Sequence, residues 1–433
     1  MSKAVWIVLL GLVAVGVMCG KSFAGGSGAY RVEVPDAAAL SLGGAVVGQA
    51  DTPVAVFYNP AGMTQIKSPE VSTNLSMIRP IGVAQPSVRE KTKMQQENFF
   101  IPGLFFVTPV AEKMSLGIGV TSNWGLSTDW AQDSFARYVS TRSSLKNEDY
   151  ILSGAYQLTE KFSLGLGVTV DASSIEKEKK ITQAGIIPDA NFKLQGDNTA
   201  AGFQVSGLYK VSDRHQFGVQ YSSDIRRKYH GKVHLDGFNN AVLTGVYKFD
   251  PNFTGSSYET DVVSKATLPQ SVDIGYCYRP TDKLTLNADI LWMDWASIKK
   301  EELAYPNETN ASRLAFLNLG NPANRDWKSA VSLGLGAEYK LVERLRLRGG
   351  YYFHQSPIPQ DTWEPTIPDA DSHSIAAGFG YDITKAMTLD FTYSAMFYDT
   401  RTINNQVGDA VGPIDGKYQQ WTNILAATVT YRF

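Results

Sequence analysis

The stretch "WTNILAATVTYRF", Trp421 to Phe433, decides the fold because two kinds of side chain alternate along it. One face carries Trp421, Asn423, Leu425, Ala427, Val429, Tyr431 and Phe433; the other carries Thr422, Ile424, Ala426, Thr428, Thr430 and Arg432. A period of two indicates a strand between two different environments. The sequence stops on an aromatic residue in mid-strand. In an open sheet, such a strand would leave its backbone N–H and C=O groups unpaired at an edge and prone to pair with another chain. We therefore expect a closed barrel, which has no edges.

The same alternation recurs in "KFSLGLGVTVDA", 161–172, and in "SAVSLGLGAEYKL", 329–341. Phe162, Leu164, Leu166, Val168 and Val170 fall opposite small and polar residues, as do Val331, Leu333, Leu335, Ala337, Tyr339 and Leu341. We expect the apolar set to face outward and the small and polar set to face the lumen. This pattern is the inverse of a small water-soluble barrel and is typical of a barrel in lipid.

Turns and loops give the strand number. Short polar turns are predicted at 112–113, 159–160, 212–213, 281–282, 342–343 and 384–385, and long polar loops near 80–97, 125–147, 174–198, 235–258, 301–328, 356–371 and 403–420. Six turns and seven loops join fourteen strands, the first near 71–78. The predicted fold is all-β: a 14-stranded antiparallel transmembrane β-barrel over 69–433, with both termini on the periplasmic side. No repeat of 20–50 residues supports a propeller.

The first residues have the pattern of an export signal. Lys3 precedes the apolar run "AVWIVLLGLVAVGVM", and the small-x-small sequence Ser22-Phe23-Ala24 follows it. The pattern predicts a signal peptide over 1–24, with an uncleaved anchor helix as the alternative. A lipoprotein reading of Cys19 is disfavoured because Met18, not a small residue, precedes it. Only Cys277 then remains, so no intramolecular disulfide is expected.

Residues 25–68 are rich in Gly and Ala and lack strand alternation. They include "VAVFYNPAGM", 54–63, in which an apolar run stops at Asn59-Pro60. Asn suits the start of a turn and Pro fixes the next backbone angle. Fourteen strands enclose a lumen that barrel side chains alone do not fill. We expect 25–68 to form a hatch, a plug folded inside the barrel; a periplasmic tail is the alternative.

The ordered set of segments resembles the FadL/TodX family of outer-membrane transporters. It comprises "GGAVVGQADTPVAVFYNPAGM" (43–63), "FVTPVAEKMSLGIGVTSNWGLSTDW" (106–130), "TLPQSVDIGYCYRP" (267–280), "MDWASI" (293–298) and 351–383. The resemblance implies a monomeric barrel with an N-terminal hatch in the outer membrane of a Gram-negative bacterium. It implies passive uptake of long-chain fatty acids or, in relatives, of aromatic and other hydrocarbons.

An external landing groove is the first part that such uptake needs. The loop "NWGLSTDWAQDSFARYV" carries Trp124, Leu126, Trp130 and Phe135 in a stretch that should be exposed. Exposed apolar patches usually mark binding sites. The alternative is that these rings pack under the loop itself. The resemblance favours the groove, because the family's external groove uses this loop.

The resemblance also implies a lateral exit at an inward kink in the third strand, here about 114–125. Ser122 to Gly125 match the family's segment at the kink, and Gly117, Gly119 and Gly125 permit bends. We expect a side chain at Gly125 to obstruct passage. Crowding on the lumen side is the alternative reason for Gly117 and Gly119.

The internal pocket should hold a carboxylate through cations in apolar surroundings. By resemblance, Lys177 after Ile175-Glu176 takes one such place and Arg325 is near the other. His354 and Gln355 stand where the fatty-acid transporters have acids. We expect the hatch to gate this pocket. Tyr30, near the start of the hatch, is expected to be an aromatic substrate contact in the pocket. The expected gating and hatch residues are Asn59, Pro60, Ala61 and Gly62, with Gly125 of the third strand.

The remaining sequence features exclude other functions. A general diffusion porin fits the barrel but not the hatch or the apolar loop. No Gly-x-Ser-x-Gly elbow supports an enzyme, and His230 with His234 lack a third metal ligand. No cofactor is expected, and 40 basic against 42 acidic residues predict no nucleic-acid partner. Expected partners are the hydrophobic substrate, outer-membrane lipid and lipopolysaccharide, and the barrel-assembly machinery through the strand that ends at Phe433.

Overall fold

The computed structural model describes residues 29–32, 34–87, 89–183, 185, 187–408 and 412–433. The predicted signal peptide, 1–24, lies outside the described residues. Among the described residues, no helix is both long enough and apolar enough to cross a membrane.

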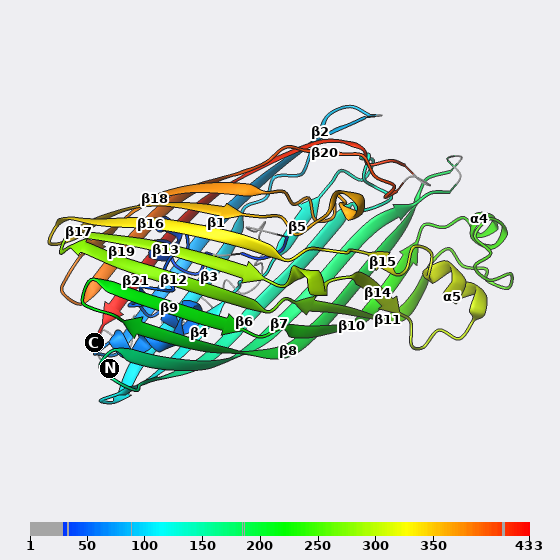
Figure 1. The fold of residues 1–433 in the computed structure, drawn as a ribbon. Coiled ribbons are helices and arrows are strands. Elements are labelled where there is room, and N and C mark those ends of the chain that lie inside the picture. The colour runs from blue at the N-terminus through cyan, green and yellow to red at the C-terminus, as the bar shows by residue number, and fades with distance from the viewer. Residues whose placement is uncertain (1–28, 33, 88, 184, 186, 409–411) are drawn as a thin grey trace.

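Fourteen antiparallel strands form a closed barrel, as the sequence predicted (Figure 1). They are β1 (Glu70–Pro86), β3 (Phe99–Ala111), β4 (Met114–Thr121), β6 (Arg142–Gln157), β7 (Phe162–Ile181), β8 (Ala190–Lys210), β9 (His215–Ser222), β12 (Ser271–Thr281), β13 (Leu284–Met293), β16 (Ala330–Val342), β17 (Leu345–His354), β18 (Ser372–Asp382), β19 (Met387–Tyr398) and β21 (Gly416–Arg432). The barrel closes because β1 pairs with β3 on one side and with β21 on the other, in register from Glu70↔Arg432 to Pro86↔Gly416.

The wall has the two faces that the alternation predicted. On β21, Trp421 and Leu425 are each 36% exposed on the outside, whereas Thr422 and Thr428 are buried. On β7, the exposed apolar side chains end at Val170, and the strand continues beyond this apolar band. The apolar outer face suits contact with lipid, and the small and polar inner face suits contact with the hatch in the lumen.

All six predicted short turns are present, but one predicted loop is wrong. The segment 174–198 is strand for most of its length, because β7 runs to Ile181 and β8 begins at Ala190. Charged residues occupy both of its faces, so the alternation that marks a strand disappears from the sequence there. The first strand is also longer than predicted, since β1 continues to Pro86.

Strands therefore extend past the barrel at the long-loop end. The extension consists of the ends of β7 and β8 with β10 (Ile225–Asp236), β11 (Tyr258–Leu268) and β14 (Lys300–Ala304). At its tip, α4 (Asn240–Gly245) and α5 (Ala311–Leu317) pack on an apolar cluster that includes Phe249 and Phe316 (Figure 1). The remaining short elements are β2 (Thr92–Lys93), β5 (Leu126–Asp129), β15 (Ala323–Asn324), β20 (Arg401–Ile403), η2 (Trp295–Ser297) and η3 (Gln360–Thr362).

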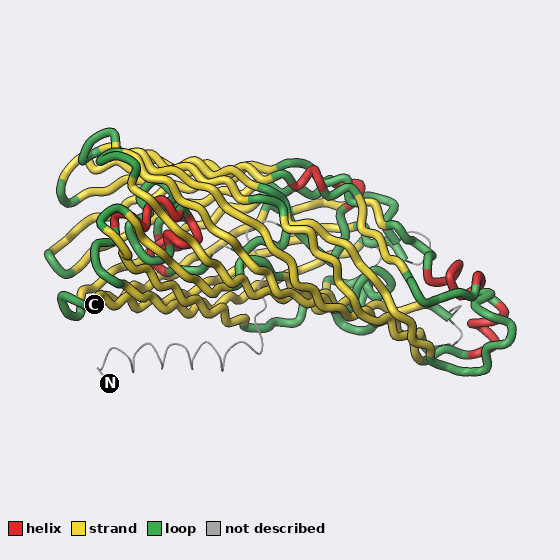
Figure 2. The backbone as a smooth tube through the Cα atoms, turned by 90° about the horizontal axis from the view of Figure 1, so that it is seen from below, coloured by secondary structure: helices red, strands yellow, loops and turns green. Residues whose placement is uncertain are grey.

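The hatch lies inside the barrel, where its helices α2 (Ala37–Ser41), α3 (Ala55–Tyr58) and η1 (Pro60–Gln65) are seen in Figure 2. Its backbone binds wall side chains directly; for example, the Val47 N–H donates to the carboxylate of Asp289 at 2.7 Å. Wall glycines allow this approach. A Cβ added at Gly218 would lie 2.0 Å from the Val47 oxygen, and one at Gly275 would lie 2.3 Å from a hatch nitrogen. The hatch therefore rests on wall positions that admit no side chain.

Candidate functional site

The third strand is interrupted at the place where the family resemblance implies a kink. β4 ends at Thr121 and β5 begins at Leu126. The backbone between them pairs with the first described residues of the hatch: Val32 N–H donates to the Asn123 oxygen, and Gly125 N–H donates to the Tyr30 oxygen, both at 2.8 Å. The hatch tip thus takes the place of a neighbouring strand at the interruption.

The interruption leaves part of β3 with one strand neighbour. Over 99–103, the only described strand that pairs with β3 is β1, because the β3–β4 ladder stops at Leu104↔Val120. On the other side, Asn147 of β6 holds the interrupted backbone. Its side-chain oxygen accepts from the N–H groups of Asn123 and Trp124 at 3.1 and 3.2 Å. A gap in the ladder is therefore built into the wall beside the hatch tip.

A cavity of about 220 Å³ lies next to this interruption, between the hatch tip and the base of the strand extension. Four of the predicted binding residues line it: Tyr30, Leu126, Lys177 and Arg325. Further apolar lining comes from Leu145, Ile175, Ala266, Leu268, Ile298, Trp327 and Ile367. The site thus brings apolar side chains together with both of the predicted cations.

Both cations are paired with acidic side chains. Glu301 of β14 forms ion pairs with Lys177 and, at 2.8 Å, with Arg325. Arg325 also binds Glu364 at 2.8 Å. Lys177 lies seven residues past Val170, so this group is beyond the apolar band. Burial would raise the pKa of Glu301, but the charges of Lys177 and Arg325 outweigh it and hold that pKa well below its usual range.

A further cation of the lining, Arg227, was missed from the sequence. The Arg227 guanidinium donates two hydrogen bonds to Asp171, at 2.9 and 2.5 Å, and both side chains are fully buried. Glu301 was also missed, since it falls in a segment expected to be loop. The alternation in "KKEELA", 299–304, was the available signal: it places Glu301 on the inner face and Glu302 on the outer one.

Aromatic side chains join the hatch tip to the wall below the cavity. The Tyr30 ring lies 6.0 Å from that of Trp124 and 5.1 Å from that of Trp295, centroid to centroid. Trp124 lines a second cavity, of about 80 Å³, deeper in the barrel. Tyr30 thus lines the larger cavity and also contacts Trp124, which lines the smaller one.

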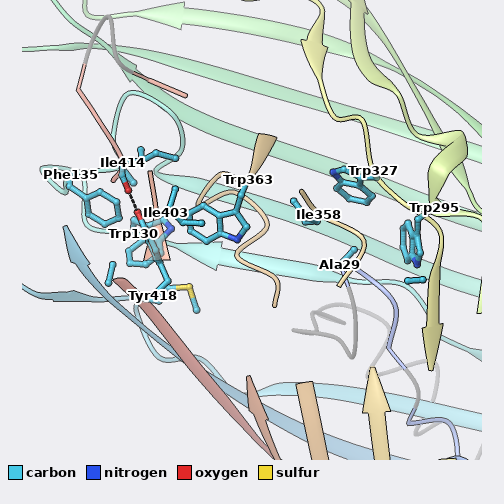
Figure 3. Close-up of a cluster of buried hydrophobic side chains, with 14 of the residues drawn as sticks. Ala29, Trp130, Phe135, Trp295, Trp327, Ile358, Trp363, Ile403, Ile414 and Tyr418 are labelled. Carbon is cyan, nitrogen blue, oxygen red and sulfur yellow. Dashed lines mark hydrogen bonds between the residues drawn. The ribbon is translucent and has the colours of Figure 1, made fainter. Parts of the chain in front are cut away.

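The expected exposure of Leu126, Trp130 and Phe135 is wrong, because all three are buried. Trp130 and Phe135 are 1% and 5% exposed, and they pack with Trp363, Ile414 and Tyr418 in a core built from the long loops (Figure 3). The indole N–H of Trp130 donates to the Pro365 oxygen at 3.1 Å. The alternative reading, in which the rings pack under the loop, is correct for these two residues. An apolar side chain in a polar loop looks the same in sequence whether it is exposed or folded inward.

The same loop region contains a buried acid. Asp369 accepts a hydrogen bond from the Ser356 hydroxyl at 2.6 Å. Burial raises the pKa of Asp369 to about 6, although the Ser356 hydroxyl, the Ala29 N–H and the Arg401 charge act against the shift. Ala29, the first described residue of the hatch, also packs in this loop core.

The Asn-Pro-Ala turn contacts the wall, not the cavity. The Asn59 amide donates to the oxygens of Val47 and Gly207 at 2.9 and 3.2 Å, and its oxygen accepts from Ala61 N–H at 3.1 Å. Pro60 occupies the first position of η1. A Cβ added at Gly62 would lie 2.2 Å from the Ala50 oxygen. These residues lock the hatch body to itself and to β8.

The other candidate residues have structural surroundings. A Cβ at Gly117 would meet Val56 at 2.5 Å, and one at Gly119 would meet Phe105 at 2.8 Å, so crowding on the lumen side explains both glycines. His354 is buried and its Nδ1 lies 2.8 Å from the Ser332 hydroxyl. Among the described residues, no group of three His, Cys, Asp or Glu side chains could hold a metal ion.

A closed barrel with an apolar outer band, an internal hatch and a partly apolar cavity defines an outer-membrane transport protein of the hydrophobic-substrate class. The family described as outer membrane protein transport protein (OMPP1/FadL/TodX) matches residues 18–433, and the chain belongs to this family. Its location is therefore the outer membrane of a Gram-negative bacterium.

Relatives and solved structures agree with this assignment. A long-chain fatty acid transport protein of Escherichia coli O157:H7 is 24% identical over 384 residues, which cover 81% of this chain and 83% of the relative. A FadL homologue of Pseudomonas aeruginosa superposes with a TM-score of 0.79 at 19% identity, covering 94% of this chain and all of that one. The Ralstonia pickettii toluene transporter TbuX superposes with a TM-score of 0.70 at 17% identity, covering 93% and 99%.

Proposed function

We propose that this protein takes up long-chain fatty acids by passive diffusion, with Lys177 and Arg325 as the carboxylate-binding residues. The observation that carries this proposal is that these two cations, 148 positions apart in the sequence, line one cavity with an apolar wall. Charge-assisted hydrogen bonds from two cations suit a carboxylate, and the apolar side chains suit an acyl chain. The fatty-acid transport named for the Escherichia coli relative supports the same substrate class.

The proposed route has three parts. The substrate lands on the long-loop end, enters the cavity beside Tyr30, and leaves through a lateral opening at the interrupted third strand. Movement of the hatch tip is the proposed gate, because Tyr30 and Val32 hydrogen-bond the interrupted backbone. Gly125, which donates to Tyr30, is proposed to lie on the exit path, where a side chain would obstruct passage. Trp124 and Leu126 are the loop residues that we retain as substrate contacts, since each lines a cavity.

The chain divides, in this proposal, into a signal peptide (1–24), a hatch (25–68) and a barrel (69–433). The protein acts as a monomer without a cofactor or catalytic activity. It contacts outer-membrane lipid and lipopolysaccharide, and the strand ending at Phe433 presents the barrel to the assembly machinery.

An aromatic hydrocarbon is the second candidate substrate. Two observations favour it: both cations already have acidic partners, and a toluene transporter shares the fold. A neutral ligand would use the apolar wall of the cavity and leave the ion pairs intact. A general diffusion porin is not favoured, because the hatch fills the lumen across the described residues.

Binding to the purified, detergent-extracted barrel tests the proposal. Oleate and toluene are titrated against wild type and Lys177→Ala, with Lys232→Ala as a control, since Lys232 pairs with Glu259 outside the cavity. Oleate binding that weakens only in Lys177→Ala supports fatty-acid uptake. Toluene binding that is indifferent to both substitutions, without oleate binding, would replace that proposal by a hydrocarbon channel.

A further inference from the structure

We propose that Glu301 is a built-in competitor for the carboxylate of a fatty-acid ligand and sets how tightly the cavity holds acids relative to neutral molecules. The inference deepens the proposed function and rests on it. It assigns the specificity-determining role to the acidic residue Glu301, in addition to the two cations that would attract the substrate.

The first argument is geometric. Glu301 uses one carboxylate oxygen for Lys177 and the other for Arg325. A carboxylate bridges two cations in this way, with one oxygen to each, and a fatty-acid head group would need the same donor nitrogens. Glu301 and a bound acid therefore exclude each other at these nitrogens.

The second argument is the charge of the group. Lys177 and Arg325 carry two positive charges, and Glu301 and Glu364 carry two negative charges, so the ion-paired group sums to zero. An additional carboxylate entering this partly buried group would therefore meet no net positive charge from these four side chains while Glu301 stays in place. A neutral ligand has no such conflict, because it needs only the apolar wall.

The third argument is that the Glu301 side chain can rotate out of its ion pairs. Its strand, β14, has five residues, and its backbone pairs with β11 from Val263↔Ala304 to Lys265↔Glu302 and with β15 at Glu301↔Ala323, so only the Glu301 side chain has to move. The Glu301 side chain is 23% exposed, so water reaches it. Rotation toward solvent would free both cations without moving the barrel. Arg325, which is 8% exposed and also held by Glu364, would stay in position for the ligand.

An exchange of carboxylates follows from these three points. An incoming acid displaces Glu301 from the cations, and the returning Glu301 side chain helps to expel the acid. The competition lowers the affinity for acids and speeds their release, which suits a transporter more than a storage protein. Neutral hydrophobic molecules bind with the ion pairs intact.

The experiment compares an acid with its uncharged analogue. Oleate and oleyl alcohol are titrated against the full-length, detergent-extracted protein as wild type, Glu301→Gln and Glu302→Gln. Glu302 is the matched control: it is the next residue on β14, is 53% exposed and pairs with Lys300. We expect Glu301→Gln to bind oleate at least about tenfold more tightly, the equivalent of one charge-assisted hydrogen bond. Oleyl alcohol affinity should be unchanged in all three proteins.

The outcomes separate this inference from the proposed function. Equal oleate affinity in wild type and Glu301→Gln would overturn the inference while leaving fatty-acid binding intact. An equal gain for oleate and oleyl alcohol would also overturn it, because shape and not charge would then be responsible. Failure of every variant to bind oleate would overturn the proposed substrate itself. Should Glu301→Gln not fold, Glu364→Gln serves instead: it frees one face of Arg325, and we expect a smaller rise in oleate affinity only.

Discussion

Replacement of Asn59 by Ala should loosen the hatch from the barrel. The Asn59 side chain is fully buried and makes three hydrogen bonds, to Val47, Gly207 and Ala61. Each net contribution is roughly 0.5–1.5 kcal/mol, and the carbonyl groups left behind are buried without this donor. The substitution should therefore cost about 2–4 kcal/mol of hatch docking. That range corresponds to a rise of roughly 30-fold to 1000-fold in the population with the hatch released.

The native Cys277 can report this release, so no cysteine has to be introduced. Its side chain is fully buried, and its cross-strand neighbours Gln216 and Asn287 both hydrogen-bond the hatch. The assay measures the rate at which a small maleimide modifies Cys277 in detergent, read by mass spectrometry of the labelled peptide. If hatch opening limits access, the Asn59→Ala rate should exceed the wild-type rate by the factor given above.

Asn405→Ala is the matched control for this measurement. Asn405 also makes three hydrogen bonds through its side chain, to Gln360, Trp363 and Val407, but in the long loops. Its replacement should leave the labelling of Cys277 at the wild-type rate. The reasoning is refuted if Asn59→Ala and Asn405→Ala label alike, or if Cys277 is modified at the rate of a free thiol in wild type.

Three further predictions concern the wall and the loop core. Gly218→Ala should displace the hatch by about 1 Å, because the new Cβ would lie 2.0 Å from a hatch oxygen, and should speed labelling of the same thiol. Gly207→Ala, whose Cβ would have 3.5 Å to its nearest neighbour, should not. Trp130→Ala should destabilise the loop core by about 3–5 kcal/mol and expose it to protease while the barrel stays resistant. Trp292→Ala, 36% exposed on the outer wall, should not. For Asp369, a folded-state pKa of about 6 against an unfolded value of 3.8 means that its protonated form favours the folded loops. That contribution, about 3 kcal/mol, is full below pH 4 and is lost as pH rises through 6. Hydrogen exchange should therefore show that the loops of the wild type lose protection as pH rises through 6, and that those of Asp369→Asn do not. An identical pH dependence of protection in both proteins would contradict this reasoning.

The wall was predictable because a single rule governs it. Alternation with a period of two, with short turns between the runs, fixed the strands and their facing, and a filled lumen required the hatch. The rule fails at 174–198, where charged residues such as Glu176 and Lys177 occupy both faces of the strand, so the apolar outer face that marks the rest of the wall is missing.

The candidate site was predictable only in part. Lys177 and Arg325 follow from the family resemblance, and the structure places both at the cavity. Glu301, which pairs with Lys177 across 124 positions, has no local signal for that contact. The burial of Trp130 depends on loops that close over one another, and no periodicity records such a contact.

The glycines of the wall restrict which part of the hatch is able to move. Backbone from Leu42 to Ala61 sits against Gly165, Gly218, Gly275, Gly334, Gly336 and Gly350, where no side chain can slide or rotate to make way. A shift of this body would have to move main chain against main chain in several strands at once. Of the described residues before this body, Tyr30 and Val32 hydrogen-bond the backbone of the interrupted third strand. Val34 is held to β1, since its oxygen accepts from the side chains of Asn74 and Ser76. A rearrangement confined to residues 29–32 would therefore break few backbone contacts, whereas one that included 42–61 would have to break many at once.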